Sequence, residues 1–421
     1  MISDVSGVVD FWILAGLLDG SVLGLLLSGI VLLYAVSVGF WLLETMFLAP
    51  QTKQKPTPFG HDDVQVRIST VNNPAVVQTT VDRLPKTLTD IRIISETQME
   101  IDGATVHVVP PEFSCTATHK GRALEWARLN VPCNREFVLF LDEDTLVESL
   151  PPLPDVDVVQ FTELPLFTGS LWTYLCEVFR IGYQFEQRAF ARMRFPLYVW
   201  GGGIAIRTAV EDQVTWDRRT ITEDTAFVWT AATVLSDFEM RVVDGRFRNQ
   251  APGSIRGMLR QRRRWMSGTR LDAGMLPLKY RLVVGTRAVI WAFSPLVVLL
   301  ATVVGFVPGA SVVSGLDWLV IVLFVFLHLV MATGAFLYEF GPVTFILAIL
   351  LTIPVVFLNT LGALWGYVSP TQQFAVTKKV DSSVIEAVHP TLSEGDLTAS
   401  SDDGPFGDTD APFEVRKLLR R

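Results

Sequence analysis

The chain has 421 residues, of which 50% are hydrophobic, and its mean hydropathy of +0.38 exceeds what a soluble enzyme of this length requires. A formal net charge of −8 argues against nucleic acid as a partner, because proteins that bind it present a basic surface. The three cysteines lack C-x-x-C spacing, which indicates reduced, buried thiols.

The apolar residues gather in long runs that are nearly free of charge. The first run covers residues 21–48, and three more follow at 288–308, 316–338 and 342–368. Because about 20 such residues cross a bilayer, the sequence predicts a multi-pass protein of the cell membrane. Lys53 and the basic residues after it follow the first run, so the positive-inside rule places the soluble part in the cytosol.

These features divide the chain into six expected parts. They are an N-terminal interfacial and transmembrane anchor (1–50), a cytosolic α/β domain (51–253), an amphipathic interfacial helix (254–280), a transmembrane region (281–370), a short segment with a motif (371–380) and a flexible acidic tail (381–421). No cleavable signal peptide is predicted, because acidic residues rather than basic ones precede the first apolar run.

Strand and helix patterns alternate in the soluble part, which predicts a mainly parallel sheet with helices on both faces. The expected strands are 64–70, 91–95, 106–109, 137–142 and 156–162, and the expected helices are 74–84 and 119–130. In such sheets, ligands bind beyond the carboxyl ends of the strands.

Three consecutive acidic residues stand at such a strand end. Asp142 and Asp144 flank Glu143 in a D-x-D arrangement directly after the apolar stretch "FVLFL". Two carboxylates are ligands that suit Mg²⁺ or Mn²⁺, which keep other positions for water and substrate phosphates. A solvated acidic turn is the alternative interpretation.

Basic and acidic residues at two predicted helix starts add to this picture. Lys120 and Arg122 open the helix at 119–130, where backbone N–H groups also favour anions. In "ITEDTAFVW", Glu223 and Asp224 follow a candidate cap, Thr222, and Asp224 is a candidate general base. The alternative is that these acids simply complement a helix dipole.

The segment "LRQRRRWMSG" (259–268) predicts a basic amphipathic helix that lies on an anionic membrane surface. On this helix Gln261, Arg264 and Trp265 share one face at i, i+3 and i+4 spacing. An arginine there can neutralise phosphate, and the tryptophan can pack against a sugar.

The segment "FAVTKK" (374–379) directly follows the last apolar run. If it closes over the active site, an even number of crossings must precede it after residue 281. Three runs lie there, so one of them does not cross, and Pro354 makes 342–368 the candidate for a re-entrant or interfacial helix. Three plain crossings with the tail outside are the alternative.

The order D-x-D, T-E-D, Q-x-x-R-W and F-x-V-T-x-K resembles the membrane-bound glycosyltransferases of family 2, such as cellulose and hyaluronan synthases. The amino-acid sequence of the soluble part looks closest to the Egghead-type β-1,4-mannosyltransferase branch, in the segments "VRISTVNNPAVVQTTVDRL" and "KGRALEWA". The resemblance implies a GT-A-type domain and roles for individual residues.

It implies that Thr70, Asn72 and Glu96 line the nucleotide pocket, although the family usually has Asp where this chain has Glu96. Lys120 would meet the diphosphate, and Asp142 and Asp144 would contact the nucleotide and the metal, with Asp144 the first choice of metal ligand. Asp224, with Glu223 beside it, would be the base. The remaining implied contacts to the leaving diphosphate, the acceptor and the bound nucleotide are Gln261, Arg264, Trp265, Phe374, Thr377 and Lys378.

The expected activity is metal-dependent, inverting transfer from a UDP- or GDP-sugar to a lipid-linked or polysaccharide acceptor at the cytosolic membrane face. A polyprenyl-phosphate glycosyltransferase is the alternative enzyme, and a membrane scaffold or transport subunit with a degenerate nucleotide domain is the non-enzyme alternative. The small number of apolar runs leaves open both a lipid acceptor and a homodimer that builds a path between subunits.

Overall fold

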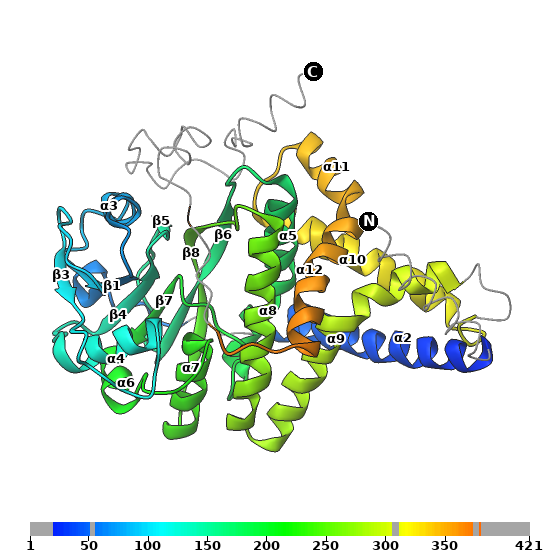
Figure 1. Ribbon diagram of the computed structural model, residues 1–421, viewed down its shortest axis with the longest axis horizontal. Helices are drawn as coiled ribbons and strands as arrows, with labels where there is room; N and C mark the ends of the chain where they lie inside the picture. Colours follow the sequence, from blue (N-terminus) through cyan, green and yellow to red (C-terminus); the bar gives the residue numbers. More distant parts are fainter. Residues whose placement is uncertain (1–19, 51–54, 305–310, 374–378, 380–421) are drawn as a thin grey trace, which may run out of the picture.

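The computed structural model of the chain describes residues 20–50, 55–304, 311–373 and 379. Figure 1 shows a twisted sheet with its helices on one side of the molecule and a group of longer helices on the other. Some of the predictions concern residues outside this range. They are those for residues 1–19, for Phe374, Thr377 and Lys378, and for the tail 381–421.

Within the described residues, eight strands form one sheet in the order β3-β2-β1-β4-β7-β6-β8-β5. The strands are β1 (Val64–Thr70), β2 (Asp90–Ser95), β3 (Thr105–Val108), β4 (Phe137–Asp142), β5 (Leu146–Ser149), β6 (Val158–Leu166), β7 (Ile204–Arg207) and β8 (Met240–Gln250). Strands β1 to β4 pair in parallel, as do β6 and β8, whereas β7 runs antiparallel to both of its neighbours. The expected α/β class is therefore confirmed.

The central strand β4 explains why an apolar run ends in carboxylates. Val138 and Phe140 pack into the apolar cluster on one face of the sheet, and Leu139 and Leu141 pack into the cluster on the other. This alternation follows from the two-residue period of a strand, and a sheet covered on both faces needs apolar residues at every position. Asp142 stands at the end of β4, where the covered part of the strand stops.

Helices cover both faces of the sheet. They are α3 (Pro74–Asp82), α4 (Lys120–Asn130), α5 (Leu171–Gln184), η3 (Phe185–Arg192), α6 (Thr208–Gln213) and α7 (Glu223–Val234). The predicted helices at 74–84 and 119–130 correspond to α3 and α4. The strands predicted at 64–70 and 137–142 coincide with β1 and β4.

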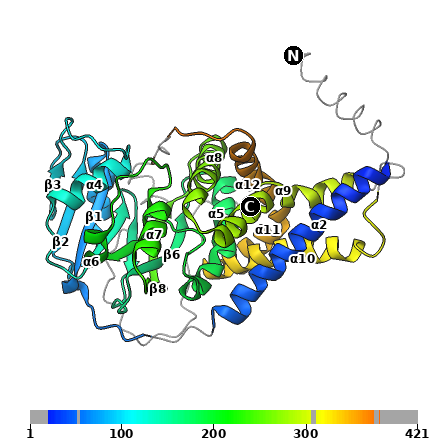
Figure 2. The same ribbon diagram turned by 90° about the horizontal axis from the view of Figure 1, so that it is seen from below.

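The second part of the molecule consists of long apolar helices together with α8. They are α2 (Gly20–Leu43), continued by η1 (Glu44–Leu48), then α8 (Ile255–Asp272), η4 (Ala273–Met275), α9 (Leu278–Val304), α10 (Asp317–Leu337), α11 (Pro342–Leu350) and α12 (Thr352–Val368). By length and composition, three helices in the described residues can cross a membrane: Val22–Leu48, Leu278–Ala301 and Asp317–Leu337. Figure 2 shows α2 and α9 side by side, extending away from the sheet.

The sequence predicts a re-entrant or interfacial helix at 342–368, and the structure has two helices there in place of one. Helices α11 and α12 meet at a bend of 61°. The break lies at Leu351 and not at Pro354. Pro354 is in the first turn of α12, where backbone N–H groups form no hydrogen bond within the helix, so a proline is tolerated there.

Both ends of the α11–α12 pair lie against the sheet domain or α8. Just before α11, Arg246 of β8 contacts Glu339 at 2.6 Å, and Arg248 donates to the Tyr338 hydroxyl at 3.2 Å. Just after α12, Arg263 of α8 donates to the carbonyl oxygen of Ser369 at 2.9 Å. The pair therefore begins and ends on the same side of the helical region.

Helix α8 is the predicted basic helix, and α12 packs along it (Figure 1). A Cβ atom on Gly362 of α12 would lie 2.6 Å from the Cβ of Arg262, so only a glycine allows this approach. The Arg262 side chain is buried between the helices. One arginine of the predicted membrane-facing helix thus faces the protein interior.

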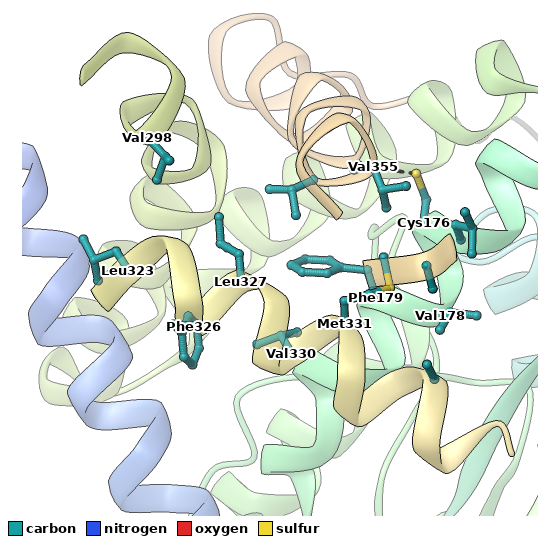
Figure 3. Packing of buried hydrophobic residues seen from close by; sticks show 14 of the residues in the cluster. Cys176, Val178, Phe179, Val298, Leu323, Phe326, Leu327, Val330, Met331 and Val355 are labelled. Carbon is teal, nitrogen blue, oxygen red and sulfur yellow. Dashed lines mark hydrogen bonds between the residues drawn. The ribbon is translucent and has the colours of Figure 1, made fainter. Parts of the chain in front are cut away.

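Helix α5 joins the sheet domain to the long helices through a shared apolar cluster (Figure 3). Its members include Cys176, Val178 and Phe179 of α5, Leu323, Phe326, Leu327, Val330 and Met331 of α10, Val298 of α9 and Val355 of α12. A Cβ on Gly182 of α5 would come within 2.0 Å of the Val330 carbonyl oxygen, so the two helices touch at their backbones. All three cysteines are free, as predicted, but only Cys176 is buried, whereas Cys115 and Cys133 are half-buried.

The contacts at both ends of the α11–α12 pair predict how engineered cysteines react with a membrane-impermeant maleimide. In a background with Cys115 and Cys133 changed to serine, Glu339→Cys and Pro370→Cys should be labelled from the same side of sealed vesicles. Ser314→Cys, in the exposed connection between α9 and α10, should be labelled from the other side. Labelling of the first two from opposite sides would show that α11 and α12 together cross the bilayer.

Candidate active site

A cavity of about 840 Å³ opens at the carboxyl edge of the sheet and is closed by α8 and the long helices. Most of the described candidate residues line it: Thr70, Glu96, Lys120, Asp142, Glu223, Asp224, Gln261, Arg264 and Trp265. Asn72, which is exposed, and Asp144, which is buried, are not among the lining residues. Residues that are far apart in the sequence are therefore gathered round one space.

Lys120, the first residue of α4, reaches the end of β4. Its Nζ lies 2.8 Å from Asp142 Oδ1, 3.6 Å from Asp224 Oδ1 and 4.0 Å from Glu223 Oε1. Burial opposes the charge on both Lys120 and Asp142, but their mutual attraction outweighs it. The pKa of the Lys120 ammonium is therefore raised, and the pKa of Asp142 is lowered. Asp142 is an ionised carboxylate at neutral pH.

Asp224 lies in the first turn of α7 and is the carboxylate with the strongest shift in the cavity. Burial raises the pKa of Asp224 to about 7; the Lys120 ammonium opposes the shift, and Glu223 and Asp142 add to it. A Cβ on Gly201 would lie 2.1 Å from Asp224 Oδ2, so this glycine leaves room for the carboxyl group. A carboxyl group with this pKa can take up a proton near neutral pH.

Asp144 lies deeper than Asp142, with its side chain fully buried. Its Oδ1 atom is 2.6 Å from Lys379 Nζ, and its Oδ2 atom accepts the backbone N–H of Gln250 at 3.1 Å. The sequence interpretation selected Lys378 for the loop and missed Lys379. The spacing F-x-V-T-x-K, counted from Phe374, ends on Lys379 and would have found it.

The D-x-D carboxylates suit a divalent cation that shares its ligands with a substrate. Within the described part of the chain, no group of three or more His, Cys, Asp or Glu side chains is placed to hold a metal. Mg²⁺ is commonly held by one or two carboxylates together with water and phosphate oxygens. Asp142 and Asp144 match that ligand set, and Lys379 shows that Asp144 accepts a positive charge at this place.

Two polar pairs lie at the sheet end of the cavity. Arg122 of α4 donates to both Glu96 oxygens, at 2.8 and 3.1 Å, which holds Glu96 after the end of β2. The Thr70 hydroxyl, at the end of β1, donates to Glu143 Oε2 at 2.6 Å. Glu143, the middle residue of the D-x-D turn, is thereby turned towards β1 and away from a metal role.

The Q-x-x-R-W residues of α8 form the facing wall. Gln261, Arg264 and Trp265 all line the cavity, as their helical spacing predicts. Arg264 Nη1 donates to the carbonyl oxygen of Ile221 at 3.4 Å, just before α7. Arg264 adds positive charge beside Asp142 and Asp224.

The cavity continues beyond Trp265 into the helical region, which the sequence interpretation did not anticipate. The lining there is mostly aromatic, aliphatic and neutral: Tyr34 of α2, Ile290, Trp291, Ser294 and Pro295 of α9, Leu327 of α10 and Thr360 of α12. One continuous space therefore leads from the carboxylates to helices that are apolar enough to cross a membrane.

Comparisons with known proteins agree with the resemblance seen in the sequence. The family model "Glycosyl transferase family group 2" matches residues 137–363. Beta-1,4-mannosyltransferase egh of Drosophila melanogaster is 25% identical over 314 residues, which cover 67% of this chain and 67% of that protein. Among solved structures, the mannosyltransferase PcManGT from Pyrobaculum calidifontis, in complex with GDP-Man and Mn²⁺, aligns over 82% of this chain and 98% of that chain. The TM-score is 0.43 and the identity 14%, too low to support conclusions about the site.

The opposite pKa shifts of two neighbouring carboxyl groups predict opposite effects on stability. The raised pKa of Asp224 means that its ionisation is unfavourable in the folded protein, so the wild type loses stability as pH rises towards and through about 7. Asp224→Asn removes this cost and should be more stable than the wild type at pH 8, by about 1–3 kcal/mol, with a smaller gain at pH 5.

Asp142→Asn is the matched control. Because the pKa of Asp142 is lowered in the folded protein, its ionised carboxylate stabilises the fold at pH values above the ordinary pKa of an aspartate. This variant should be less stable than the wild type at both pH values. The measurement is thermal unfolding in detergent with a metal chelator present. A Tm for Asp224→Asn below the wild-type value at pH 8 would contradict the assignment.

Proposed function

The chain belongs to glycosyl transferase family group 2, and we propose that this enzyme moves a sugar from a nucleotide-diphosphate sugar to an acceptor hydroxyl with inversion at the anomeric carbon. The observation that carries the proposal is the group formed by Lys120, Asp142 and Asp224. It combines a fixed positive charge, an ionised carboxylate and a carboxyl group whose pKa is about 7 in one cavity.

Asp224 acts as the general base in the proposed reaction. The acceptor oxygen attacks the anomeric carbon of the donor, and its proton passes to the Asp224 carboxylate. A single displacement breaks the bond to the diphosphate from the opposite face, which inverts the anomeric centre and requires no nucleophilic side chain. Burial keeps the carboxylate basic enough to accept the proton near neutral pH.

Basic side chains neutralise the departing diphosphate. Lys120 and Arg264 lie at the cavity wall beside Asp142, and Lys379 reaches Asp144. Fixed cations in a site with little water stabilise the charge that develops on the leaving group. We propose that Asp142 and Asp144 hold Mg²⁺ or Mn²⁺, which would supply further charge neutralisation at the phosphates.

The acceptor is proposed to be lipid-linked. The part of the cavity between α2, α9, α10 and α12 carries mainly neutral side chains and leads into the helical region, which suits an apolar tail behind an acceptor sugar. A growing polysaccharide is the alternative acceptor. The activity named for the Drosophila relative makes mannose the first donor sugar to test.

We also propose that the sheet domain is cytosolic and that α9 and α10 are the two crossings after it. The return of the chain to α8 at Ser369 and to Asp144 at Lys379 supports an even number of crossings. Under this arrangement the α11–α12 pair dips into the membrane and leaves on the side it entered.

The activity is tested by measuring nucleotide release and product formation from a panel of UDP- and GDP-sugars. The purified protein in lipid, with Mn²⁺ or Mg²⁺, is offered octyl and dodecyl glycosides as acceptors. A lipid-linked acceptor predicts transfer to at least one alkyl glycoside. Release of no nucleotide from any donor would overturn the proposed function.

Asp224→Asn should lower the transfer rate by about 10²–10⁴-fold, because an amide cannot take up the acceptor proton. The Kd for the donor nucleotide should stay within about twofold of the wild-type value, since the change preserves the shape of the side chain. In the wild type, the transfer rate should rise with pH to a plateau above about 7, because Asp224 must be deprotonated.

The matched control is Asp212→Asn, which changes the same residue type at an exposed position of α6, outside the cavity lining. Its transfer rate and pH profile should equal those of the wild type. If Asp224→Asn kept the wild-type rate, another group would have to be the base.

A further inference from the structure

A buried network of ion pairs joins α5 to α8 next to the candidate acceptor tryptophan. Arg262 Nη2 lies 2.6 Å from Glu177 Oε1, with side chains 0% and 4% exposed. The other oxygen of Glu177 accepts from Arg180 Nε at 2.6 Å. Arg180 Nη1 in turn lies 2.7 Å from Glu163 Oε2 of β6. Two arginines and two glutamates thus balance their charges away from water.

Both arginines of this network lie against Trp265. The guanidinium carbon of Arg262 is 4.4 Å from the centroid of the Trp265 ring, and that of Arg180 is 5.4 Å from it. A guanidinium within about 6 Å of an indole centroid is attracted to the π-system, more strongly where water is excluded. The network therefore contacts an aromatic ring that lines the cavity.

Hydrogen bonds to neutral side chains extend the network at both ends. Arg262 Nε donates to Asn359 Oδ1 of α12 at 2.7 Å. At the other end, Asn249 of β8 donates to Glu163 at 3.3 Å and accepts from the Thr145 hydroxyl at 2.6 Å. Thr145 directly follows Asp144, so the network spans from α12 to the D-x-D turn.

The placement of this network favours a role in positioning. Burying four charges is costly, and apolar side chains of similar volume often hold two helices together at least as well. Apolar side chains form no directional hydrogen bonds, so they could not hold two guanidinium groups against one ring. Glu163, Glu177 and Arg180 also line the cavity, so the network borders the substrate space.

We infer that Glu177 and Arg262 are positioning residues that fix the Trp265 indole where the acceptor sugar binds. Glu177 holds the two guanidinium groups, and Arg262 links their position to α12. The inference rests on the proposed function and deepens it, because it assigns acceptor binding to residues outside the Q-x-x-R-W pattern. Under this inference, acceptor binding depends on the α8 wall of the cavity, and donor binding depends on the opposite wall, at the carboxyl edge of the sheet.

The main variant is Glu177→Gln, measured with the alkyl glycoside that gives the fastest transfer in the panel. The KM for this glycoside should rise about tenfold, the size expected when guanidinium–indole contacts in a desolvated site are lost. The donor KM should change less than about twofold, and a larger share of the donor should be hydrolysed by water in place of being transferred.

Arg180→Lys is the second variant, and it keeps the positive charge beside Glu177 while removing the planar group near Trp265. It should raise the acceptor KM in the same direction by a smaller factor. The matched control is Glu211→Gln, which neutralises an equally buried carboxylate, paired with Arg67 at 3.0 Å outside the cavity lining. Its acceptor KM and hydrolysed share should match the wild type even if its Tm falls.

An active wild type, together with an unchanged acceptor KM in both Glu177→Gln and Arg180→Lys, would overturn this inference and leave the proposed function standing. An equal rise of the acceptor KM in Glu211→Gln would also overturn it, because a general loss of stability would then explain the effect. A wild type that turns over no activated sugar would overturn the proposed function and the inference together.

Discussion

One buried ammonium group shared by three carboxylates is the interaction on which the site depends. Lys120 lies within 4.0 Å of Asp142, Glu223 and Asp224. Burial disfavours the charged form of each carboxyl group, and the positive charges of Lys120 and Arg264 oppose that effect unequally. Asp142, at the shortest distance, stays ionised, and the pKa of Asp224 rises to about 7. Similar side chains thereby differ in charge near neutral pH, which is the difference that the proposed reaction uses.

The fold produces this arrangement by bringing the ends of several strands and helices to one edge of the sheet. Strand β4 delivers Asp142, α4 begins with Lys120, and α7 begins with Glu223 and Asp224. The helices α5 and α8 then serve both the sheet domain and the long apolar helices, through the cluster of Figure 3 and the contacts of α12 with α8. As a result, one cavity reaches from the carboxylates to helices that are apolar enough to cross a membrane.

The elements that the sequence predicted best are those whose pattern is local. The strands at 64–70 and 137–142 were found to the residue. Apolar and polar residues alternate in the first, and the second is a continuous apolar run, as expected of a covered strand. That 342–368 is a re-entrant or interfacial helix stays a prediction, because the bend fits a broken crossing as well as a re-entrant segment, and the break precedes Pro354. Lys379 was missed in favour of its neighbour Lys378, and nothing local marked Glu177 or Arg180 as partners of α8.

Sequence by itself determined the family, the order of the motifs and the presence of several apolar helices beside an α/β domain, since each follows from residues close together in the chain. Tertiary structure alone decided which of the many charges meet. Arg262 looked like one more basic residue of a surface helix, yet the close approach of α12 at Gly362 buries it against Glu177, 85 positions away in the chain. Such pairings depend on how closely helices pack, and no short pattern of residues records that distance.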